Sequence, residues 1–224
     1  MLNHSYSSLI ETLSATFARA EIAHPLRVAI DGRTAAGKTT FAGELAAALT
    51  AAGRPVIQTS IDGFHRPKAE RYARGRRSPE GYYHDARDLG AVKRLLLAPL
   101  GPDGDRLYRT ASFDLENDKP IDQTPTRAPA DTILLVDGTF LQRPELSDNW
   151  DFVVFIDVSA ETSLARGVAR DQDMLGGTEE ALSLYKERYL PAFSLYEQAC
   201  NPHKGANVVI DNRDWGRPKA LFRT

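Results

Sequence analysis

A glycine-rich segment between residues 31 and 40 has the residue types and spacing of a phosphate-binding loop. It reads Asp-Gly-Arg-Thr-Ala-Ala-Gly-Lys-Thr-Thr and matches the pattern G-x-x-x-x-G-K-S/T without a mismatch. In such a loop the glycines let backbone N–H groups turn toward phosphate oxygens, the lysine reaches the β- and γ-phosphates, and the next hydroxyl binds Mg²⁺. The segment therefore predicts binding of a nucleoside triphosphate and Mg²⁺ through Gly32, Arg33, Thr34, Ala35, Ala36, Gly37, Lys38, Thr39 and Thr40.

The sequence on both sides of this loop favours the prediction over a chance match in a glycine-rich turn. Residues 26–30 form a short β-prone run, and residues 39–52 carry apolar side chains at a helical spacing that ends at Gly53. Phosphate binding requires a strand, a loop and a helix whose N-terminus points at the anion.

Two acidic residues follow β-rich segments and are candidates for chemistry at the bound triphosphate. Asp62 comes after the run 55–60, which we expect to lie beside the strand of the phosphate loop. Its carboxylate could accept the proton of an attacking hydroxyl or hold metal-bound water. Asp137 ends the apolar run 132–137, a pattern typical of the acid that holds Mg²⁺ in P-loop enzymes. The alternatives are a helix N-cap or turn for Asp62 and a simple Asp-Gly turn for Asp137.

Arg166 and Arg170 are four residues apart in a predicted helix and therefore share one face. Phosphoryl transfer spreads negative charge over the oxygens of the transferring group, and guanidinium groups stabilise that charge. We expect both arginines to reach the same phosphate. The alternative is a solvated helix face on which one of them pairs with Asp171 or Asp173.

Five β-rich runs must form the frame that positions these groups, at residues 26–30, 55–60, 132–137, 152–158 and 207–210. They alternate with helices expected after the phosphate loop and at residues 86–97, 160–170 and 179–199. Continuous apolar strands separated by helices predict an α/β fold, a three-layer P-loop sandwich with a mostly parallel five-stranded sheet and helices on both faces.

We expect the remaining segments to belong to a single domain that spans residues 1–224. Residues 1–23 predict an amphipathic N-terminal helix. Residues 63–85 and 99–131 predict insertions on the side where a phosphoryl acceptor would bind, the second with one strand around residues 108–113. Residues 171–178 contain two consecutive glycines and predict a mobile lid that excludes water.

Composition limits the classes of function. The 224 residues include 28 basic and 30 acidic side chains, a formal charge of −2, which argues against a global nucleic-acid or membrane surface. No stretch approaches the roughly 18 apolar residues of a membrane span, and no basic leader precedes an apolar core, so we predict a cytoplasmic protein. Cys200 is the only cysteine, which excludes an intramolecular disulfide and predicts a small buried residue on a helix. The oligomeric state is open, a homo-oligomer included.

In this order the motifs resemble those of the uridine kinase and phosphoribulokinase superfamily of P-loop small-molecule kinases, over residues 24–212. Beyond the loop and the acids above, the similar segments are residues 83–86 with Asp88 (H-P-D-A-x-D), Tyr108 with residues 113–114 (Y-D), residues 136–138 (E-G), residues 165–171 (R-R-x-x-R-D) and residues 207–212 (closing strand).

The resemblance implies an ATP- and Mg²⁺-dependent kinase. Its catalytic residues would be Lys38, Asp62, Arg166 and Arg170, with Asp62 as the base or a magnesium partner. The metal would be held by Thr39, Asp62 and Asp137, and the weaker candidates for the acceptor pocket are Asp62, His65, Tyr82, His84, Tyr108 and Arg109.

Three departures from the uridine kinase pattern bear on the acceptor. The Asp-Gly-Phe-His form of residues 62–65 looks closer to pantothenate-kinase-like members than to the D-x-F-Y of uridine kinases. Tyr82 stands opposite the aspartate with which uridine kinases hold the ribose. The segment after Asp114 lacks the histidine that they place beside the pyrimidine.

A cluster of basic residues lies at residues 66–77, with five arginines and one lysine. These side chains would bind a phosphorylated or acidic acceptor, or they would form a solvated basic loop, and the sequence leaves both open. One short patch on a slightly acidic chain does not indicate nucleic-acid binding.

We therefore expect transfer of the γ-phosphoryl group of ATP to a hydroxyl of a small metabolite, with a nucleoside or another ribose-bearing acceptor first. The alternatives are a pantothenate, sugar or sugar-phosphate kinase of the same superfamily, and a regulatory P-loop NTPase switch without a small-molecule acceptor. The sequence has no N-K-x-D guanine-reading motif, which counts against the switch.

Overall fold

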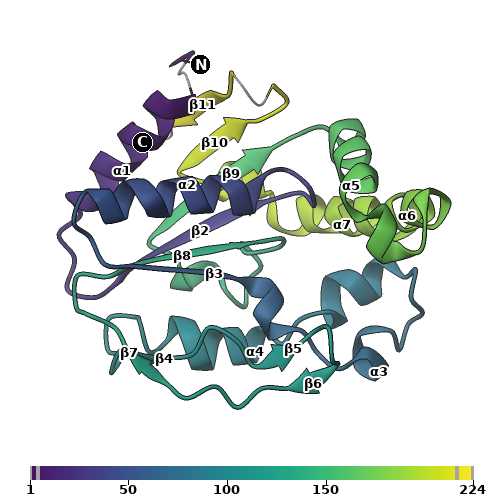
Figure 1. Cartoon of the computed structure of the whole chain (residues 1–224), viewed down its shortest axis with the longest axis horizontal. Helices are drawn as coiled ribbons and strands as arrows, with labels where there is room; N and C mark the ends of the chain where they lie inside the picture. Colours follow the sequence, from purple (N-terminus) through teal and green to yellow (C-terminus); the bar gives the residue numbers. More distant parts are fainter. Residues whose placement is uncertain (1, 4–5, 215–216, 223–224) are drawn as a thin grey trace.

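A parallel sheet forms the centre of the fold in the computed structural model, which describes residues 2–3, 6–214 and 217–222 (Figure 1). The five predicted strands are present as β2 (Leu26–Gly32), β3 (Val56–Ser60), β8 (Ile133–Gly138), β9 (Phe152–Asp157) and β10 (Val208–Asp211). Two short strands, β11 (Lys219–Phe222) and β1 (Leu2–Asn3), extend the sheet in antiparallel orientation. Within the described residues the sheet has 7 strands in the order β1-β11-β10-β9-β2-β8-β3, and the predicted α/β class is confirmed.

The strand that leads to Asp62 does not lie beside the strand of the phosphate loop. β8 pairs with both β2 and β3, so Ile30 and Ser60 each lie opposite Asp137. β8 is buried along its whole length and suits a central position, whereas β3 is partly exposed and forms an edge of the sheet. The expected pairing of 55–60 with 26–30 is therefore wrong, but the carboxyl ends of the three strands still meet at one edge.

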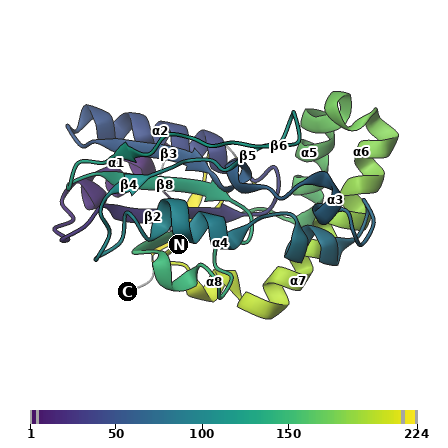
Figure 2. The same ribbon diagram turned by 90° about the horizontal axis from the view of Figure 1, so that it is seen from below.

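Alternate residues of β2 contribute to two separate hydrophobic cores. Val28 and Ile30 pack in one cluster with α1 (Tyr6–Ala18) and α2 (Lys38–Ala51). Ala29 packs in the other cluster with α7 (Leu190–Cys200), on the opposite side of the sheet (Figure 2). A strand covered on both faces must be apolar throughout, which explains the continuous apolar runs and the three layers.

Helix α1 is shorter than the predicted helical segment 1–23. It begins at Tyr6 and ends at Ala18, while Leu2 and Asn3 belong to a strand, and residues 1, 4 and 5 lie outside the described residues. The helix is amphipathic as expected, with one buried face formed by Leu9, Ile10, Leu13, Ser14 and Phe17. No helix within the described ranges combines the length and the apolar character that a membrane crossing needs.

The segment 171–178, predicted as a lid, is mostly helical. α5 (Ala160–Leu175) continues beyond its expected end at residue 170 and stops where Gly176 adopts a φ of 101°. Gly176 and Gly177 form the turn into α6 (Thr178–Leu184), which continues through the π-helical turn η5 (Tyr185–Tyr189) into α7. A lid at this position would be a helical hairpin.

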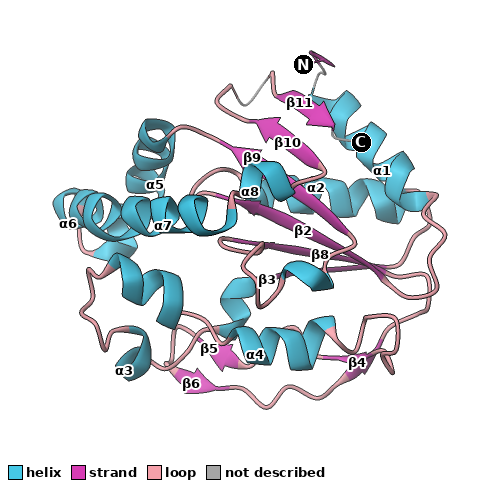
Figure 3. Cartoon of the chain, turned by 180° about the vertical axis from the view of Figure 1, so that it is seen from behind, coloured by secondary structure: helices cyan, strands magenta, loops and turns pink. Residues whose placement is uncertain are grey.

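Between β3 and β8 the chain forms a layer of short elements, drawn below the sheet in Figure 1 and again in Figure 3. Its helical turns are η1 (Ile61–Phe64), α3 (Lys68–Arg71), η2 (Gly81–Asp85), α4 (Leu89–Val92) and η3 (Lys93–Leu97). The helix expected at residues 86–97 begins only at Leu89, because the Asp88 carboxylate caps it by accepting a 2.9 Å hydrogen bond from the Ala91 N–H.

The single strand predicted around residues 108–113 is wrong. β4 (Leu107–Tyr108) pairs with β7 (Thr126–Arg127), and β5 (Phe113–Asp114) pairs with β6 (Lys119–Pro120). The backbone between β4 and β5 bonds elsewhere, since the Arg109 N–H donates to Leu95 and the Ser112 N–H donates to Gly63. The remaining short helices are η4 (Ser147–Asn149) and α8 (Pro202–Gly205).

Candidate functional site

The predicted phosphate loop connects β2 to α2 and has a backbone that only certain residues allow. A Cβ at Gly32 would collide with the backbone oxygen of Ile156, and Gly37 has a φ of 95°. Side chains from distant elements hold the loop from outside. The Ser163 hydroxyl donates to the Thr34 carbonyl at 2.7 Å, and the Asn212 amide donates to the Ala36 carbonyl at 2.9 Å. The loop is therefore preorganised before any ligand binds.

Lys38 is buried, and its Nζ donates a 2.6 Å hydrogen bond to the Arg33 carbonyl within the same loop. Burial lowers the pKa of Lys38, and the charges of Asp31 and Asp137 oppose that effect. The Arg33 side chain points away from the loop, because its guanidinium pairs with Glu197 at 2.7 Å. Arg33 therefore offers the predicted ligand its backbone only.

Asp31 is a buried acid that the sequence interpretation missed. Its carboxylate accepts hydrogen bonds from the Gly32 N–H at 2.8 Å, from the Gln142 amide at 3.0 Å and from the Tyr196 hydroxyl. Burial raises the pKa of Asp31, and these hydrogen bonds oppose the rise. Asp31 therefore holds the first turn of the phosphate loop in place.

Thr39 and Asp137 form the pair expected to hold Mg²⁺. The Thr39 hydroxyl donates to Oδ2 of Asp137 at 2.8 Å, and burial raises the pKa of Asp137. Among the described residues no group of three or more His, Cys, Asp or Glu could hold a metal by itself. Mg²⁺ is usually held by one or two carboxylates together with substrate phosphates, so this hydroxyl–carboxylate pair fits the ion.

Asp62 lies in η1, directly after β3, and its side chain is 57% exposed. Its Oδ1 accepts two hydrogen bonds from Arg87, from Nε at 3.2 Å and from Nη2 at 2.7 Å. Partial desolvation by the protein around the carboxylate raises the pKa of Asp62, but the positive charge of Arg87 outweighs this effect, so the pKa lies below its ordinary value. Asp62 is therefore an ionised carboxylate that keeps one oxygen open toward the cleft.

Arg87 is the second residue that the sequence interpretation missed, because it occupies the unspecified position of the H-P-D-A-x-D stretch. A β-bridge between His65 and Arg87 places it beside Asp62. Its side chain is 7% exposed, and the guanidinium lies 5.3 Å from the centre of the Tyr82 ring. A buried arginine needs a charged partner, and Asp62 supplies one.

One cleft with a volume of about 90 Å³ brings these groups together. Its lining residues come from the phosphate loop and from the ends of β3 and β8, with three further side chains from η2, α5 and the segment before α4. They are Thr34, Ala35, Lys38, Thr39, Ser60, Asp62, Tyr82, Arg87, Asp137, Gly138, Thr139 and Arg170.

The two predicted arginines of α5 separate in the structure. Arg170 lines the cleft, and its Nε donates to Asp171 at 2.7 Å. Arg166 lies outside the cleft lining and donates to the carbonyls of Asn212 at 3.1 Å and Arg213 at 3.0 Å. They share a helix face, but the carbonyls at the end of β10 draw Arg166 away, so the structure does not place both at one phosphate.

The weaker acceptor candidates also divide. Tyr82 lines the cleft, whereas His65 is buried behind Asp62, with its Nδ1 at 2.7 Å from the Asp62 carbonyl. Burial and then the charge of Arg87 lower the pKa of His65 to about 4, so this imidazole is neutral near pH 7. The other three lie elsewhere: His84 is exposed beside Tyr83, Tyr108 packs against a hydrophobic core, and Arg109 pairs with Asp122.

The five arginines of the basic segment 66–77 all have acidic partners. The pairs are Arg66–Glu70 at 3.6 Å, Arg71–Asp118 at 3.1 Å, Arg74–Asp85 at 2.7 Å, Arg76–Glu180 at 3.4 Å and Arg77–Glu180 at 2.7 Å. This pairing favours the solvated structural loop over an anion-binding patch, because the positive charge is compensated within the chain.

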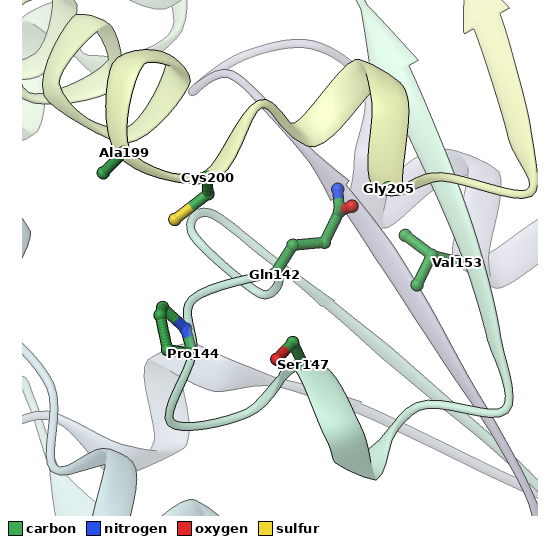
Figure 4. Close-up of a pocket in the computed structure, with 7 residues that line it drawn as sticks. All are labelled: Gln142, Pro144, Ser147, Val153, Ala199, Cys200 and Gly205. Atoms are coloured by element: carbon green, nitrogen blue, oxygen red, sulfur yellow. The ribbon is translucent and has the colours of Figure 1, made fainter.

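A second pocket, of about 340 Å³, shares no lining residue with this cleft (Figure 4). It is lined by Gln142, Pro144, Ser147, Val153, Ala199, Cys200 and Gly205. None of the predicted phosphate or acceptor residues lines it. Cys200, expected to be buried, is half-buried at the end of α7, with its sulfur 3.6 Å from the Tyr83 hydroxyl.

Comparison with known proteins agrees with this geometry. The sequence profile of the Phosphoribulokinase / Uridine kinase family matches residues 28–212. Uridine-cytidine kinase B of Dictyostelium discoideum is 27% identical over 188 residues, which cover 84% of this chain and 74% of that protein. The uridine kinase of Leuconostoc citreum (strain KM20) is 26% identical over 194 residues, which cover 83% and 87%. The solved structure of a possible uridine kinase from Bacillus stearothermophilus aligns with a TM-score of 0.71 at 26% identity, covering 89% of this chain and 96% of that chain.

Proposed function

The chain belongs to the phosphoribulokinase/uridine kinase family of ATP-dependent small-molecule kinases, and we propose that it phosphorylates a hydroxyl of a small metabolite bound over Asp62. One observation carries this proposal. The cleft that holds the phosphate loop and the Thr39–Asp137 pair also holds an ionised, half-exposed carboxylate with a buried cation behind it. A nucleotide-dependent switch needs the first two features and has no use for the third.

The groups of the cleft divide the work of phosphoryl transfer. Thr39 and Asp137 would hold Mg²⁺, which supplies positive charge to the β- and γ-phosphates when bound. Lys38 neutralises negative charge that develops on the transferring phosphoryl group, and Arg170 adds a second positive charge to the cleft from α5. The loop N–H groups orient the triphosphate.

Asp62 orients the attacking hydroxyl and accepts its proton at the oxygen that Arg87 leaves open. A carboxylate with a lowered pKa is a weak base. Weak basicity suits a loose transition state, because the attacking oxygen has formed little of its new bond and still holds its proton tightly.

Two classes of acceptor have specific support. A nucleoside, or another ribose-bearing acceptor, is favoured by the uridine kinases among the relatives. A sugar phosphate or pantothenate, each of which carries a negative charge, is favoured by the position of Arg87 beside the proposed base.

ADP release with Mg²⁺-ATP tests the function against uridine, cytidine, nicotinamide riboside, pantothenate, free sugars and sugar phosphates, with a no-acceptor control. We expect one acceptor class to raise the rate far above the control. ADP release that ignores every acceptor and rises only with a protein partner would instead identify a regulatory switch.

The variant Asp62→Asn tests the role of the carboxylate. We expect ATP binding to persist and turnover to fall by about 10²-fold or more, the scale for loss of a positioned general base. Asp148→Asn, a change of an exposed acid that does not line the cleft, is the matched control. Loss of nucleotide binding in Asp62→Asn would assign this residue to the metal or to folding.

A further inference from the structure

We propose that Arg87, together with Thr139, selects acceptors that carry a carboxylate or a phosphate beside the hydroxyl that is phosphorylated. The inference rests on the proposed kinase function and names the substrate class within it.

The Arg87 guanidinium has hydrogen-bonding capacity that the described part of the chain does not use. Nε and Nη2 donate to Asp62, whereas Nη1 is buried and has no hydrogen-bond partner among the described residues. Buried polar groups in native structures are almost always paired, so this one needs an explanation. Arg87 lines the cleft, so a ligand group that enters the cleft is the natural partner of Nη1.

Thr139 presents a second unused group in the same cleft. Its hydroxyl is buried and makes no hydrogen bond of ordinary length in the described structure, although it lies near the Tyr82 hydroxyl. Thr139 follows β8 directly after Gly138, whereas Arg87 comes from the segment before α4, so two independent elements each bring an unpaired polar atom to one site.

The chemistry of these unpaired groups points to an anion. Arg87 can only donate, and a hydroxyl such as that of Thr139 can donate as well. The two carboxylates of the cleft lining are already assigned, Asp62 to the reacting hydroxyl and Asp137 to the metal site. A neutral polyol brings several hydroxyl donors that would need acceptors, while a carboxylate or phosphate only accepts and makes the stronger, charge-assisted bond to arginine.

Matched pairs of acceptors test this preference. The pairs are glycerate and glycerol 3-phosphate, each against glycerol, with uridine as a neutral nucleoside. In both anions the charged group lies within two carbon atoms of a free hydroxyl. We expect the charged member of one pair to have a kcat/KM at least about tenfold above its neutral partner and above uridine. The pair that responds tells a carboxylate from a phosphate.

Two variants assign the preference to residues. Arg87→Lys keeps the charge and removes the planar fork, and Thr139→Val removes the hydroxyl with little change of shape. We expect Arg87→Lys to reduce the charged-to-neutral ratio of kcat/KM by roughly ten- to a hundredfold, and Thr139→Val to reduce it less. Most of the change should be a higher KM for the charged acceptor. The Kd of a fluorescent ATP analogue should stay unchanged, and general structural damage would lower both members of a pair equally.

The failures of the two proposals are distinguishable. Two results would overturn the role of Arg87 and leave the kinase function intact. One is acceptor-dependent ADP release that prefers uridine or the neutral acceptor of a pair. The other is a charged-to-neutral ratio of kcat/KM that neither variant alters. If no acceptor stimulates ADP release, the proposed function itself fails and the inference falls with it.

Discussion

Thr39 and Asp137 are 98 positions apart in the chain, yet the threonine hydroxyl donates a 2.8 Å hydrogen bond to the aspartate. Thr39 stands in the first turn of α2, and Asp137 stands near the end of β8, beside the loop strand β2. The two oxygens are thus placed before a cation arrives, as a Mg²⁺ site shared with nucleotide phosphates requires.

Loss of either oxygen should weaken the use of Mg²⁺. We expect Asp137→Asn to raise the Mg²⁺ concentration for half-maximal ADP release by about tenfold or more, and Thr39→Ala to raise it less, since a carboxylate carries the charge. A Mg²⁺ titration at fixed ATP measures both. Thr50→Ala, which removes an exposed hydroxyl further along α2, is the control. An unchanged Mg²⁺ requirement in Asp137→Asn would exclude this site.

Among the described residues that line the cleft, Lys38 is the only lysine, and its charge is buried beside the loop carbonyl of Arg33. We expect Lys38→Ala to lower kcat by roughly 10²- to 10³-fold, the scale for removal of one preorganised charge-stabilising donor. Lys93→Ala, a change of an exposed lysine, should have no such effect. A Lys38→Ala enzyme with near-normal turnover would show that the residue does not act on the transferring group.

Much of this architecture could be predicted because it is encoded locally. The phosphate loop and the acid at the end of β8 each occupy one short segment. The five parallel strands are continuous apolar runs whose two faces both need cover. Family and fold class followed from those features and are confirmed by the comparisons.

The features that could not be predicted depend on contacts between distant segments. The position of β8 between β2 and β3 is a matter of pairing, and no single strand encodes it. The backbone bridge to His65 positions Arg87. The arginines of residues 66–77 pair with acids as distant in the sequence as Glu180, so they are not free to bind an anion.

The Asp62–Arg87 pair should respond asymmetrically to mutation. Removal of Asp62 leaves a guanidinium that is 7% exposed without its counter-charge, whereas removal of Arg87 leaves a carboxylate that is 57% exposed and can be hydrated. We expect Asp62→Ala to lower the free energy of unfolding by about 3 kcal/mol, the lower end of the range for an uncompensated buried charge, and Arg87→Met to lower it by about 1 kcal/mol or less. Urea unfolding measures both, and an equal or larger loss in Arg87→Met would contradict the asymmetry.

His65 should make the stability of the fold depend on pH. Burial and the charge of Arg87 lower the pKa of His65 from 6.5 to about 4. Between pH 4 and pH 6.5 this imidazole is therefore protonated in the unfolded chain and neutral in the folded chain. The contribution of neutral His65 to stability is therefore complete above pH 6.5 and is lost as the pH falls toward 4.

The size of this effect follows from the two pKa values. The difference between 6.5 and about 4 corresponds to roughly 3 kcal/mol of unfolding free energy. Urea unfolding at pH 7 and at pH 4.5 measures how much unfolding free energy each protein loses between the two pH values. We expect this loss to be smaller in His65→Gln than in the wild type, by most of this amount. His84→Gln, which replaces an exposed imidazole, should keep the wild-type loss. If His65→Gln and the wild type lose stability in parallel as the pH falls, the imidazole of His65 takes up its proton in the folded protein as readily as in the unfolded chain.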